Sequence, residues 1–242
     1  MKELEWLVSG CERVFGNNLR CILLLGSVQH GDTTPFSDTD LVVVIGSMSL
    51  AETTQFRTLV RSAEMLIDCS LVCQDELPVS SDHFHLGSHG CYHLELVLKH
   101  TRCLWGRNIL LDLPSPTEEA IRHSVAEKIS EYTWWVRRMF VESNRQRSLE
   151  TNYQLNSRLI KVVRDLLYLT DHHGLDQSLG ETIGLFLNKY GEQLSEAERL
   201  ALLGLADSGR IASNVANMSE GYLATRYSLV NFVYKRMTEL AL

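Results

Sequence analysis

The pattern of apolar residues changes near the middle of the chain, and this change limits the folds that are possible. In the first half, apolar residues form short runs at residues 21–25, 41–45 and 65–72, as in buried strands, and the run at 41–45 is rich in β-branched side chains. Between the last two runs, residues 50–63 have helical spacing and contain no proline or glycine. The first half therefore predicts a small mixed sheet with a helix over one face.

In the second half, apolar residues recur every three or four positions, as they do on the buried face of a helix. This spacing predicts helices over residues 125–139, 155–169, 179–190, 195–205 and 222–240. The sequence Ser115-Pro116-Thr117-Glu118 is typical of a helix start, with Ser115 as N-cap and Pro116 at the first helical position. We predict an α+β fold in two domains, a mixed-sheet domain at 1–114 and an all-helical bundle at 115–242.

Composition and charge argue against several classes of protein. The 242 residues carry a formal net charge of −7, whereas a protein that binds along a polynucleotide needs a basic footprint. No apolar run reaches the roughly 18 residues of a membrane-spanning helix, and the first fifteen residues are typical of an amphipathic helix rather than a signal peptide. The six cysteines form no CxxC pair, which favours reduced thiols. We expect a cytoplasmic protein.

The segment around the first two predicted strands contains the residues that indicate chemistry. Gly26 and Ser27 follow the first strand, ten residues intervene, and Asp38 and Asp40 then open the next strand. A Gly-Ser turn lets backbone amides approach a phosphate, because glycine has no Cβ and serine adds a hydroxyl donor. Asp38 and Asp40 point the same way in an extended strand. Two such carboxylates repel unless a cation joins them, and their oxygens suit Mg²⁺.

A third acid, Asp68, lies within the next apolar run. A charge there is costly without a partner, and Asp68 completes a carboxylate triad if its strand neighbours residues 41–45. Each feature alone has a structural interpretation: Gly26-Ser27 as a turn, the aspartate pair as a strand edge, and Asp68 as a core acid bound to backbone amides. Their joint occurrence in this order favours a metal site.

These residues resemble the signature of the DNA-polymerase-β-like nucleotidyltransferase superfamily: Gly-Ser, about ten residues, Asp-x-Asp, then a later acid on a strand. The likeness is greatest to the stand-alone bacterial branch that includes the aminoglycoside adenylyltransferases. Residues 101–114 resemble the stretch that joins the two domains of the family, and residues 156–174 resemble its central C-terminal helix.

The resemblance implies a nucleotidyltransferase with two Mg²⁺ ions and ATP as co-substrate. Asp38 and Asp40 would bind metal with the triphosphate, and Asp68 would share the second metal or accept the proton of the attacking hydroxyl. Gly26 and Ser27 would hold the β- and γ-phosphates. AMP, or another nucleoside monophosphate, would pass to a hydroxyl of a small molecule, with an aminoglycoside as one candidate acceptor.

One departure from the family pattern concerns the loop after the central helix, where relatives often have a triphosphate-binding lysine. Residues 175–179 contain none, and the basic residues lie instead on the preceding helix, at Arg158, Lys161 and Arg164. Arg164 resembles the helix arginine of the family, so we assign Lys161 and Arg164 to nucleotide binding. We expect the sheet face with the acids to have no second layer within residues 1–112, so that the helical half completes a cleft.

Two alternatives remain open. The chain could be a nucleotide-binding regulatory or antitoxin-type module of the same fold, acting on protein or RNA or without turnover.

Several histidines and Cys91 are close in sequence and could suggest a zinc site. Their spacing matches no familiar zinc site, and packing against the sheet is the simpler interpretation. These histidines are His83, His85, His89, His93 and His100.

Overall fold

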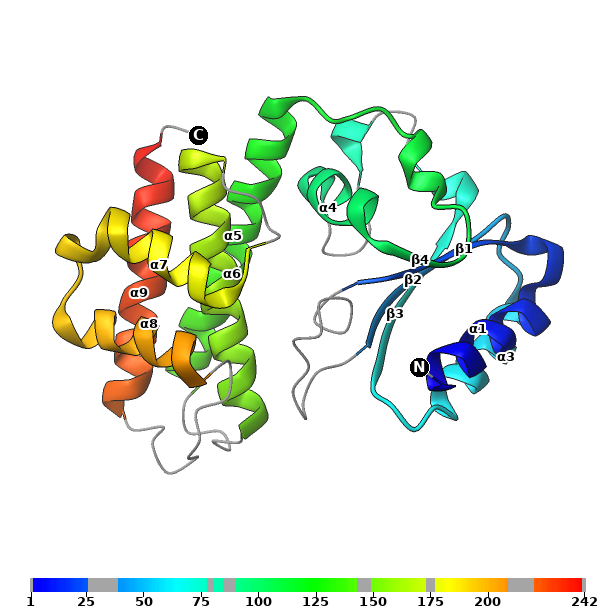
Figure 1. Ribbon diagram of the computed structural model, residues 1–242, viewed down its shortest axis with the longest axis horizontal. Helices are drawn as coiled ribbons and strands as arrows, with labels where there is room; N and C mark the ends of the chain where they lie inside the picture. Colours follow the sequence, from blue (N-terminus) through cyan, green and yellow to red (C-terminus); the bar gives the residue numbers. More distant parts are fainter. Residues whose placement is uncertain are drawn as a thin grey trace. The chain divides into compact units, whose positions relative to one another are not determined.

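The computed structural model describes residues 2–25, 39–77, 81–84, 90–142, 149–172, 177–208 and 220–240. Contacts between Cα atoms divide the chain into two compact units, Met1–Ile121 and Arg122–Leu242 (Figure 1). This division falls within the first long helix of the second half. The boundary of the functional domains after residue 114 stays a prediction.

The first unit is a four-stranded sheet with helices on both faces (Figure 1). Its strand order is β3-β2-β1-β4; β1 pairs antiparallel with both β2 and β4, and β2 pairs parallel with β3. The mixed sheet is therefore confirmed. The elements are α1 (Lys2–Phe15), β1 (Leu19–Leu24), β2 (Thr39–Ile45), α3 (Leu50–Arg61), β3 (Ile67–Cys73), α4 (Cys91–Leu96) and β4 (Arg102–Gly106), with short 3₁₀ turns at Gly16–Asn18, Gln74–Glu76, Ser81–His83, Leu98–His100 and Ile109–Asp112.

The strand β4 was not expected from the sequence, which suggested only a joining stretch at 101–114. Its five residues, RCLWG, are half-buried or exposed rather than an apolar run, because β4 is an edge strand. Gly106 takes a positive φ of 71°. A Cβ at this glycine would lie 2.3 Å from the Arg20 carbonyl oxygen, so the strand passes β1 here only because the residue is glycine.

Alternation along the strands sends successive side chains to opposite faces of the sheet. On β2, the face with Leu41, Val43 and Ile45 packs with Leu7, Cys11 and Phe15 of α1 and with Phe56 of α3. The opposite face presents Val42 and Val44, with Val72 of β3, to a second apolar cluster that contains Phe84, Cys91, Leu94, Leu98 and Leu110. The β2 run is buried on both sides, which explains its continuous apolar sequence.

The second unit consists of helices, as the periodicity predicted. Buried side chains of α6, among them Leu159, Val162 and Leu166, form its centre, and α6 contacts α7 and α9. The elements are α5 (Glu118–Val141), α6 (Leu149–Asp171), α7 (Leu179–Tyr190), α8 (Glu196–Ser208) and α9 (Glu220–Glu239), with a 3₁₀ turn at Gly191–Gln193. Among the described residues, no helix is both long and apolar enough to cross a membrane.

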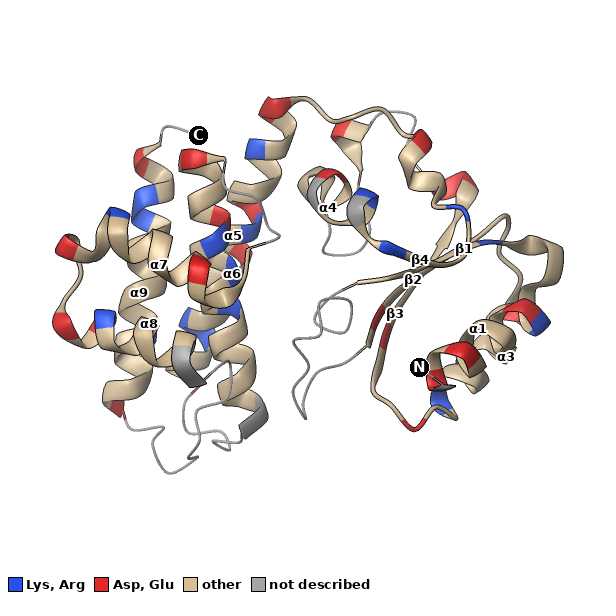
Figure 2. Cartoon of the chain, in the orientation of Figure 1, with Lys and Arg blue, Asp and Glu red and all other residues tan. Residues whose placement is uncertain are grey.

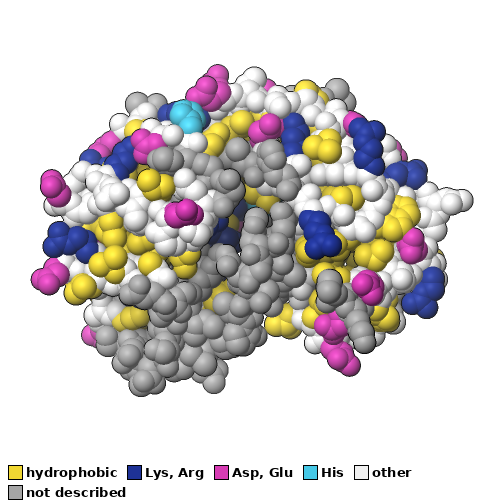
Figure 3. Space-filling view, viewed as in Figure 1, with side chains coloured by type: hydrophobic (Ala, Val, Ile, Leu, Met, Phe, Trp, Pro, Cys, Tyr) yellow, Lys and Arg dark blue, Asp and Glu magenta, His cyan; other side chains and the backbone are white. Residues whose placement is uncertain are grey.

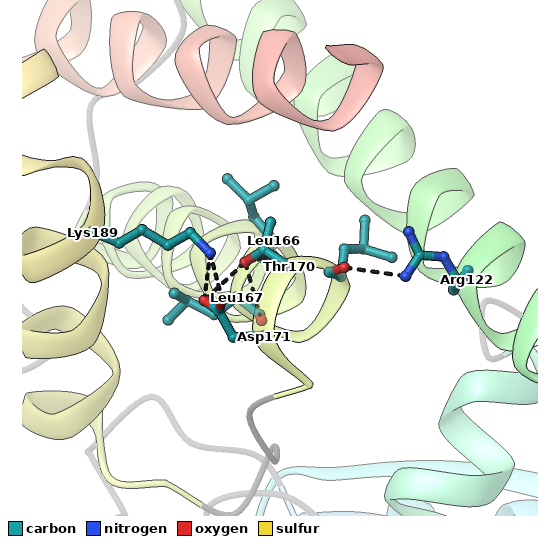
Figure 4. Close-up of polar contacts among 7 residues, drawn as sticks. Arg122, Leu166, Leu167, Thr170, Asp171 and Lys189 are labelled. Carbon is teal, nitrogen blue, oxygen red and sulfur yellow. Dashed lines mark hydrogen bonds and ion pairs between the residues drawn. The ribbon is translucent and has the colours of Figure 1, made fainter. Parts of the chain in front are cut away.

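Polar side chains fix the ends of these helices. At the C-terminal end of α6, Arg122 Nη1 donates to the Leu169 carbonyl at 3.3 Å, and Lys189 Nζ of α7 lies 2.5 and 2.7 Å from the two carboxylate oxygens of Asp171 (Figure 4). Cations stabilise this end because helix carbonyls concentrate negative charge there. Before α8, Ser195 and Glu198 form the predicted capping box.

The predicted N-cap of α5 is wrong by two residues. The helix begins at Glu118, and the Thr117 Oγ1 accepts from the Ala120 backbone N–H at 3.3 Å. Thr117 is therefore the N-cap, since its carbonyl also accepts from the Ile121 N–H. The Ser115 hydroxyl instead donates to Glu95, so a tertiary contact decides between two plausible caps.

Candidate active site

The register between β2 and β3 brings two of the predicted acids together. Asp40 on β2 is the direct partner of Asp68 on β3, although 27 residues separate them in the sequence. Paired residues on parallel strands point to the same face, and neighbouring strands lie about 4.8 Å apart. Figure 2 shows acidic positions side by side on these strands. Asp38 lies outside the described residues, so the complete triad stays a prediction.

The two acids lie at the end of a face that is otherwise apolar. Beyond Asp40, the same face of β2 presents Val42 and Val44, which are 2% and 0% exposed. Beyond Asp68, β3 presents Ser70 and then the buried Val72. Asp68 itself is exposed and Asp40 is partly buried. Both carboxylates can therefore remain hydrated or bind a ligand at the end of the apolar face.

The expectation that residues 1–112 leave this face without a second layer is wrong. The segment with Phe84, Leu94, Leu98 and Leu110 packs on Val42, Val44 and Val72. The sequence around α4 mixes histidines with leucines, so no continuous apolar pattern indicated that this segment packs on the sheet. Within the described part of the chain, this layer covers the valines and leaves Asp68 exposed at the acidic end of the face.

Backbone hydrogen bonds beside Asp40 show where the chain leaves β1. The Leu25 N–H donates to the Asp40 carbonyl at 2.9 Å, and the Thr39 N–H donates to the Leu66 carbonyl at 2.8 Å. Leu25 directly precedes Gly26 in the sequence. The chain therefore leaves β1 beside Asp40, while Gly26 and Ser27 lie outside the described residues.

A third acid, Glu95, lies on α4, the helix that covers the acidic face. The Lys99 Nζ lies 2.8 Å from Glu95 Oε2, and the Ser115 hydroxyl donates to Glu95 Oε1 at 3.1 Å. The Lys99 side chain is 11% exposed and that of Glu95 is 25% exposed. These contacts hold the carboxylate in one orientation.

The assigned basic residues lie on α6 in the second unit. Arg164 Nη2 donates to the Gln177 carbonyl at 3.5 Å, and Lys161 is exposed with its Nζ 5.7 Å from the centre of the Tyr132 ring. Arg158 stacks on Trp135 with its Cζ 3.6 Å from the ring centre. Figure 2 shows basic positions gathered on α5 and α6. Arg158 is thus held by an aromatic ring, whereas Lys161 reaches solvent.

Sequence reasoning missed a buried carboxyl group beside these basic residues. Asp165 on α6 is 4% exposed, and its Oδ2 has no hydrogen-bond partner among the described residues. Burial raises the pKa of Asp165 to about 7, although Arg164, Lys161 and Lys128 of α5 lower it. The signal was available, because Asp165 falls within the apolar stripe of residues 155–169.

No group of three or more metal-binding side chains is present among the described residues. Asp38, His85 and His89 lie outside the described residues. His83 is exposed and His93 is half-buried on α4. The packing of α4 against the sheet agrees with the simpler interpretation of this histidine-rich stretch.

The fold is similar to that of a solved enzyme. The crystal structure of the spectinomycin adenyltransferase AAD(9) from Enterococcus faecialis, which contains ATP and spectinomycin, matches with a TM-score of 0.63. The match covers 98% of this chain and 98% of that chain, at 13% sequence identity. No family model and no curated protein matches the sequence. The expected fold, a small mixed sheet followed by a helical unit, is therefore confirmed.

Proposed function

We propose that the chain is a Mg²⁺-dependent nucleotidyltransferase that transfers AMP from ATP to a hydroxyl group of a small molecule. The observation that carries this proposal is the direct pairing of Asp40 with Asp68 at the exposed end of an apolar sheet face. Nothing in the packing of the strands requires two carboxylates there, and a divalent cation would offset their repulsion. The fold of an adenyltransferase supports the same conclusion.

The donor set fits the proposed metal. Carboxylate oxygens from two neighbouring strands are hard ligands of the kind that Mg²⁺ prefers, and the partial exposure of the pair leaves room for water and phosphate oxygens. Asp38, Asp40 and Asp68 would hold the metal. When bound, two Mg²⁺ ions would stabilise both the attacking and the leaving oxygen of the transfer.

The residues of the chain would supply the other parts of the reaction. Gly26 and Ser27 would bind the β- and γ-phosphates through backbone amides and a hydroxyl, and Lys161 and Arg164 would offset the triphosphate charge. The acceptor oxygen forms a bond to the α-phosphorus while the bond to the β-phosphate oxygen breaks, and pyrophosphate leaves with that electron pair. Asp68 would take the proton of the acceptor hydroxyl.

The acceptor that we propose is a small cationic alcohol of the aminoglycoside class. The solved neighbour was crystallised with spectinomycin, and a chain with a net charge of −7 suits a cationic acceptor. A polynucleotide is a weaker candidate. On the face seen in Figure 3, acidic and basic side chains are interspersed rather than gathered in a basic stripe.

The test is incubation with Mg²⁺-ATP and a panel of aminoglycosides, followed by pyrophosphate release and the mass gain of one nucleotide on the acceptor. We expect Asp40→Asn to reduce turnover by at least 10²-fold, the lower end of the range for charge stabilisation at a reacting centre. Asp75→Asn is the control, since Asp75 is exposed on the same unit and outside the site. Equal activity of the wild type and Asp40→Asn would overturn the assignment.

The alternative is a nucleotide-binding module without turnover, which the missing lysine in residues 175–179 favours. The same assay separates the two functions. A module would bind Mg²⁺-ATP, measured by calorimetry, and would release no pyrophosphate with any acceptor. An enzyme with an unidentified acceptor would still hydrolyse ATP slowly, and Asp40→Asn would abolish that background.

A further inference from the structure

A buried arginine that has no acidic partner among the described residues lies between α6 and α9, remote in sequence from the proposed catalytic residues. Arg226 of α9 is 6% exposed, and its Nε donates to Asn156 Oδ1 of α6 at 2.9 Å. Its guanidinium carbon lies 3.3 Å from the centre of the Tyr222 ring. We refer to Asn152, Asn156, Tyr222 and Arg226 as the Arg226 cluster.

The neutral residues of the cluster are bonded to one another. The Asn156 Nδ2 donates to Asn152 Oδ1 at 3.0 Å, and the Tyr222 hydroxyl contacts both Asn152 Oδ1 and Asn156 Oδ1. Asn152 and Asn156 are 1% and 0% exposed. Because the Asn152 oxygen already accepts two hydrogen bonds, the amide orientation is fixed and its Nδ2 must point elsewhere.

One donor of this cluster lacks an acceptor, and its one cation lacks a negatively charged partner among the described residues. Asn152 Nδ2 is buried and has no hydrogen-bond partner among the described residues. Within the same part of the chain, Arg226 forms no ion pair, and its contacts are those with Asn156 and Tyr222. Glu220, the acid in the first turn of α9, is exposed and forms no ion pair with Arg226.

A buried guanidinium without a counter-charge is costly, since arginine is rarely buried unless it is paired. Burial lowers the pKa of Arg226 from its usual value, which reflects this cost. The guanidinium nevertheless stays charged, because the pKa of arginine is far above neutrality. The cluster therefore carries one positive charge, and the oxygens that accept hydrogen bonds from Arg226 are neutral. A bound anion would neutralise this charge.

The helix geometry adds to the positive potential. Asn152 lies near the start of α6 at Leu149, and Tyr222 lies near the start of α9 at Glu220, so the contact between their side chains joins the first turns of the two helices. Each N-terminal end carries partial positive charge and favours anions. The buried charge and the free amide donor of the cluster lie at this shared end.

We propose that the Arg226 cluster is a binding site for a tetrahedral oxyanion, a phosphate group either free or on a larger molecule. A phosphate offers several acceptor oxygens, which match the fork of guanidinium donors and the amide of Asn152. The site is separate from the proposed triphosphate contacts, because Lys161 and Arg164 lie on later turns of α6. It therefore does not rest on the proposed function.

The first test is thermal unfolding of the full chain in inorganic phosphate or sulfate, compared with chloride at equal ionic strength. We expect a saturable rise in Tm of about 2–4 °C, the shift that one kcal/mol of binding free energy gives a chain of this size. Arg226→Gln should lose the response. Lys235→Gln, which removes an exposed charge from the same helix, should keep it.

The second test introduces a negatively charged side chain in place of the bound anion. It leaves Arg226 unchanged, so it remains informative if the Arg226 variant does not fold. Asn152→Asp places a carboxylate of nearly equal shape in the cluster. If the cluster needs an anion, this variant should have a higher Tm than the wild type in phosphate-free buffer and should no longer respond to phosphate. A lower Tm with the phosphate response unchanged would overturn the proposal.

Two further comparisons define the site. Arg164→Ala should keep the phosphate response, and its loss in this variant would assign the effect to the triphosphate contacts and overturn the proposal. Glycerol 3-phosphate tests the source of the phosphate. A response equal to that of inorganic phosphate supports recognition of the group on larger molecules, and a response to the inorganic ion alone supports a site for the free anion.

Discussion

A single carboxyl group, that of Asp165, should make the stability of the helical unit depend on pH. Its pKa rises from 3.8 in the unfolded chain to about 7 in the native protein, chiefly because of burial, while Arg164, Lys161 and Lys128 oppose the rise. Between these two values the native protein holds a proton that the unfolded chain has released. The contribution of Asp165 to stability is therefore greatest below about pH 4 and is lost as the pH rises to about 7.

We predict that Asp165→Asn raises the free energy of unfolding at pH 8 and changes it little at pH 4. The gain is at most about 4 kcal/mol, since one pKa unit corresponds to about 1.36 kcal/mol. Urea denaturation between pH 4 and 8 measures the difference, and Glu239→Gln on the exposed side of α9 is the control. A variant less stable than the wild type at pH 8 would show that the neighbouring cations stabilise the Asp165 carboxylate by more than burial destabilises it.

At the scale of elements, α4 and the segment around it determine how much of the acidic face is open. Leu94 of α4 is fully buried in the cluster that contains Val42, Val44 and Val72. This layer holds the strands together at the covered end and leaves the pair of Asp40 and Asp68 at the open end. The position of the layer thus sets the size of the candidate site.

We predict that Leu94→Ala lowers the free energy of unfolding by about 2–5 kcal/mol, the usual cost of a cavity at a buried leucine. Leu66→Ala is the matched control, because Leu66 is 66% exposed and its loss should cost less than about 0.5 kcal/mol. Chemical denaturation provides the measurement. Equal effects of the two substitutions would mean that α4 is not packed against the sheet.

At the scale of the whole molecule, the proposed function combines the carboxylates of the first unit with the cations of the second. The expected cleft between the two halves stays a prediction. If both groups contact the same triphosphate, removing one should change the effect of removing the other. This coupling can be measured without knowing the acceptor.

We predict that Arg164→Ala weakens Mg²⁺-ATP binding by about 1.5–3 kcal/mol, the range for a hydrogen bond to a charged group. In the double variant with Asp40→Asn, the two losses should differ from their sum by about 0.5–3 kcal/mol. Isothermal titration calorimetry on the four proteins gives both values. Wild-type affinity in Arg164→Ala would place the triphosphate away from α6.

Much of the fold could be predicted from local sequence. The apolar runs at 21–25 and 41–45 correctly predicted β1 and β2, because strands buried on both faces need apolar residues throughout. Helical spacing correctly predicted α5 to α9, because burial of one helix face repeats apolar residues every three or four positions. The edge strand β4 was missed, since a strand with one exposed edge needs no apolar run. The N-cap of α5 was misplaced because Ser115 is bonded to Glu95.

The sequence by itself pointed to the residues of the candidate site, because acids placed next to apolar strands in this order match the requirements of a metal site. It also determined the order of sheet and helices. Only the tertiary structure decided that Asp40 faces Asp68, since parallel pairing joins residues far apart in the chain. It likewise decided that α4 covers part of that face, and that Arg226 and Asp165 are buried where α6 meets its neighbours. Burial of a charge depends on which surfaces meet, and local periodicity contains no information about that.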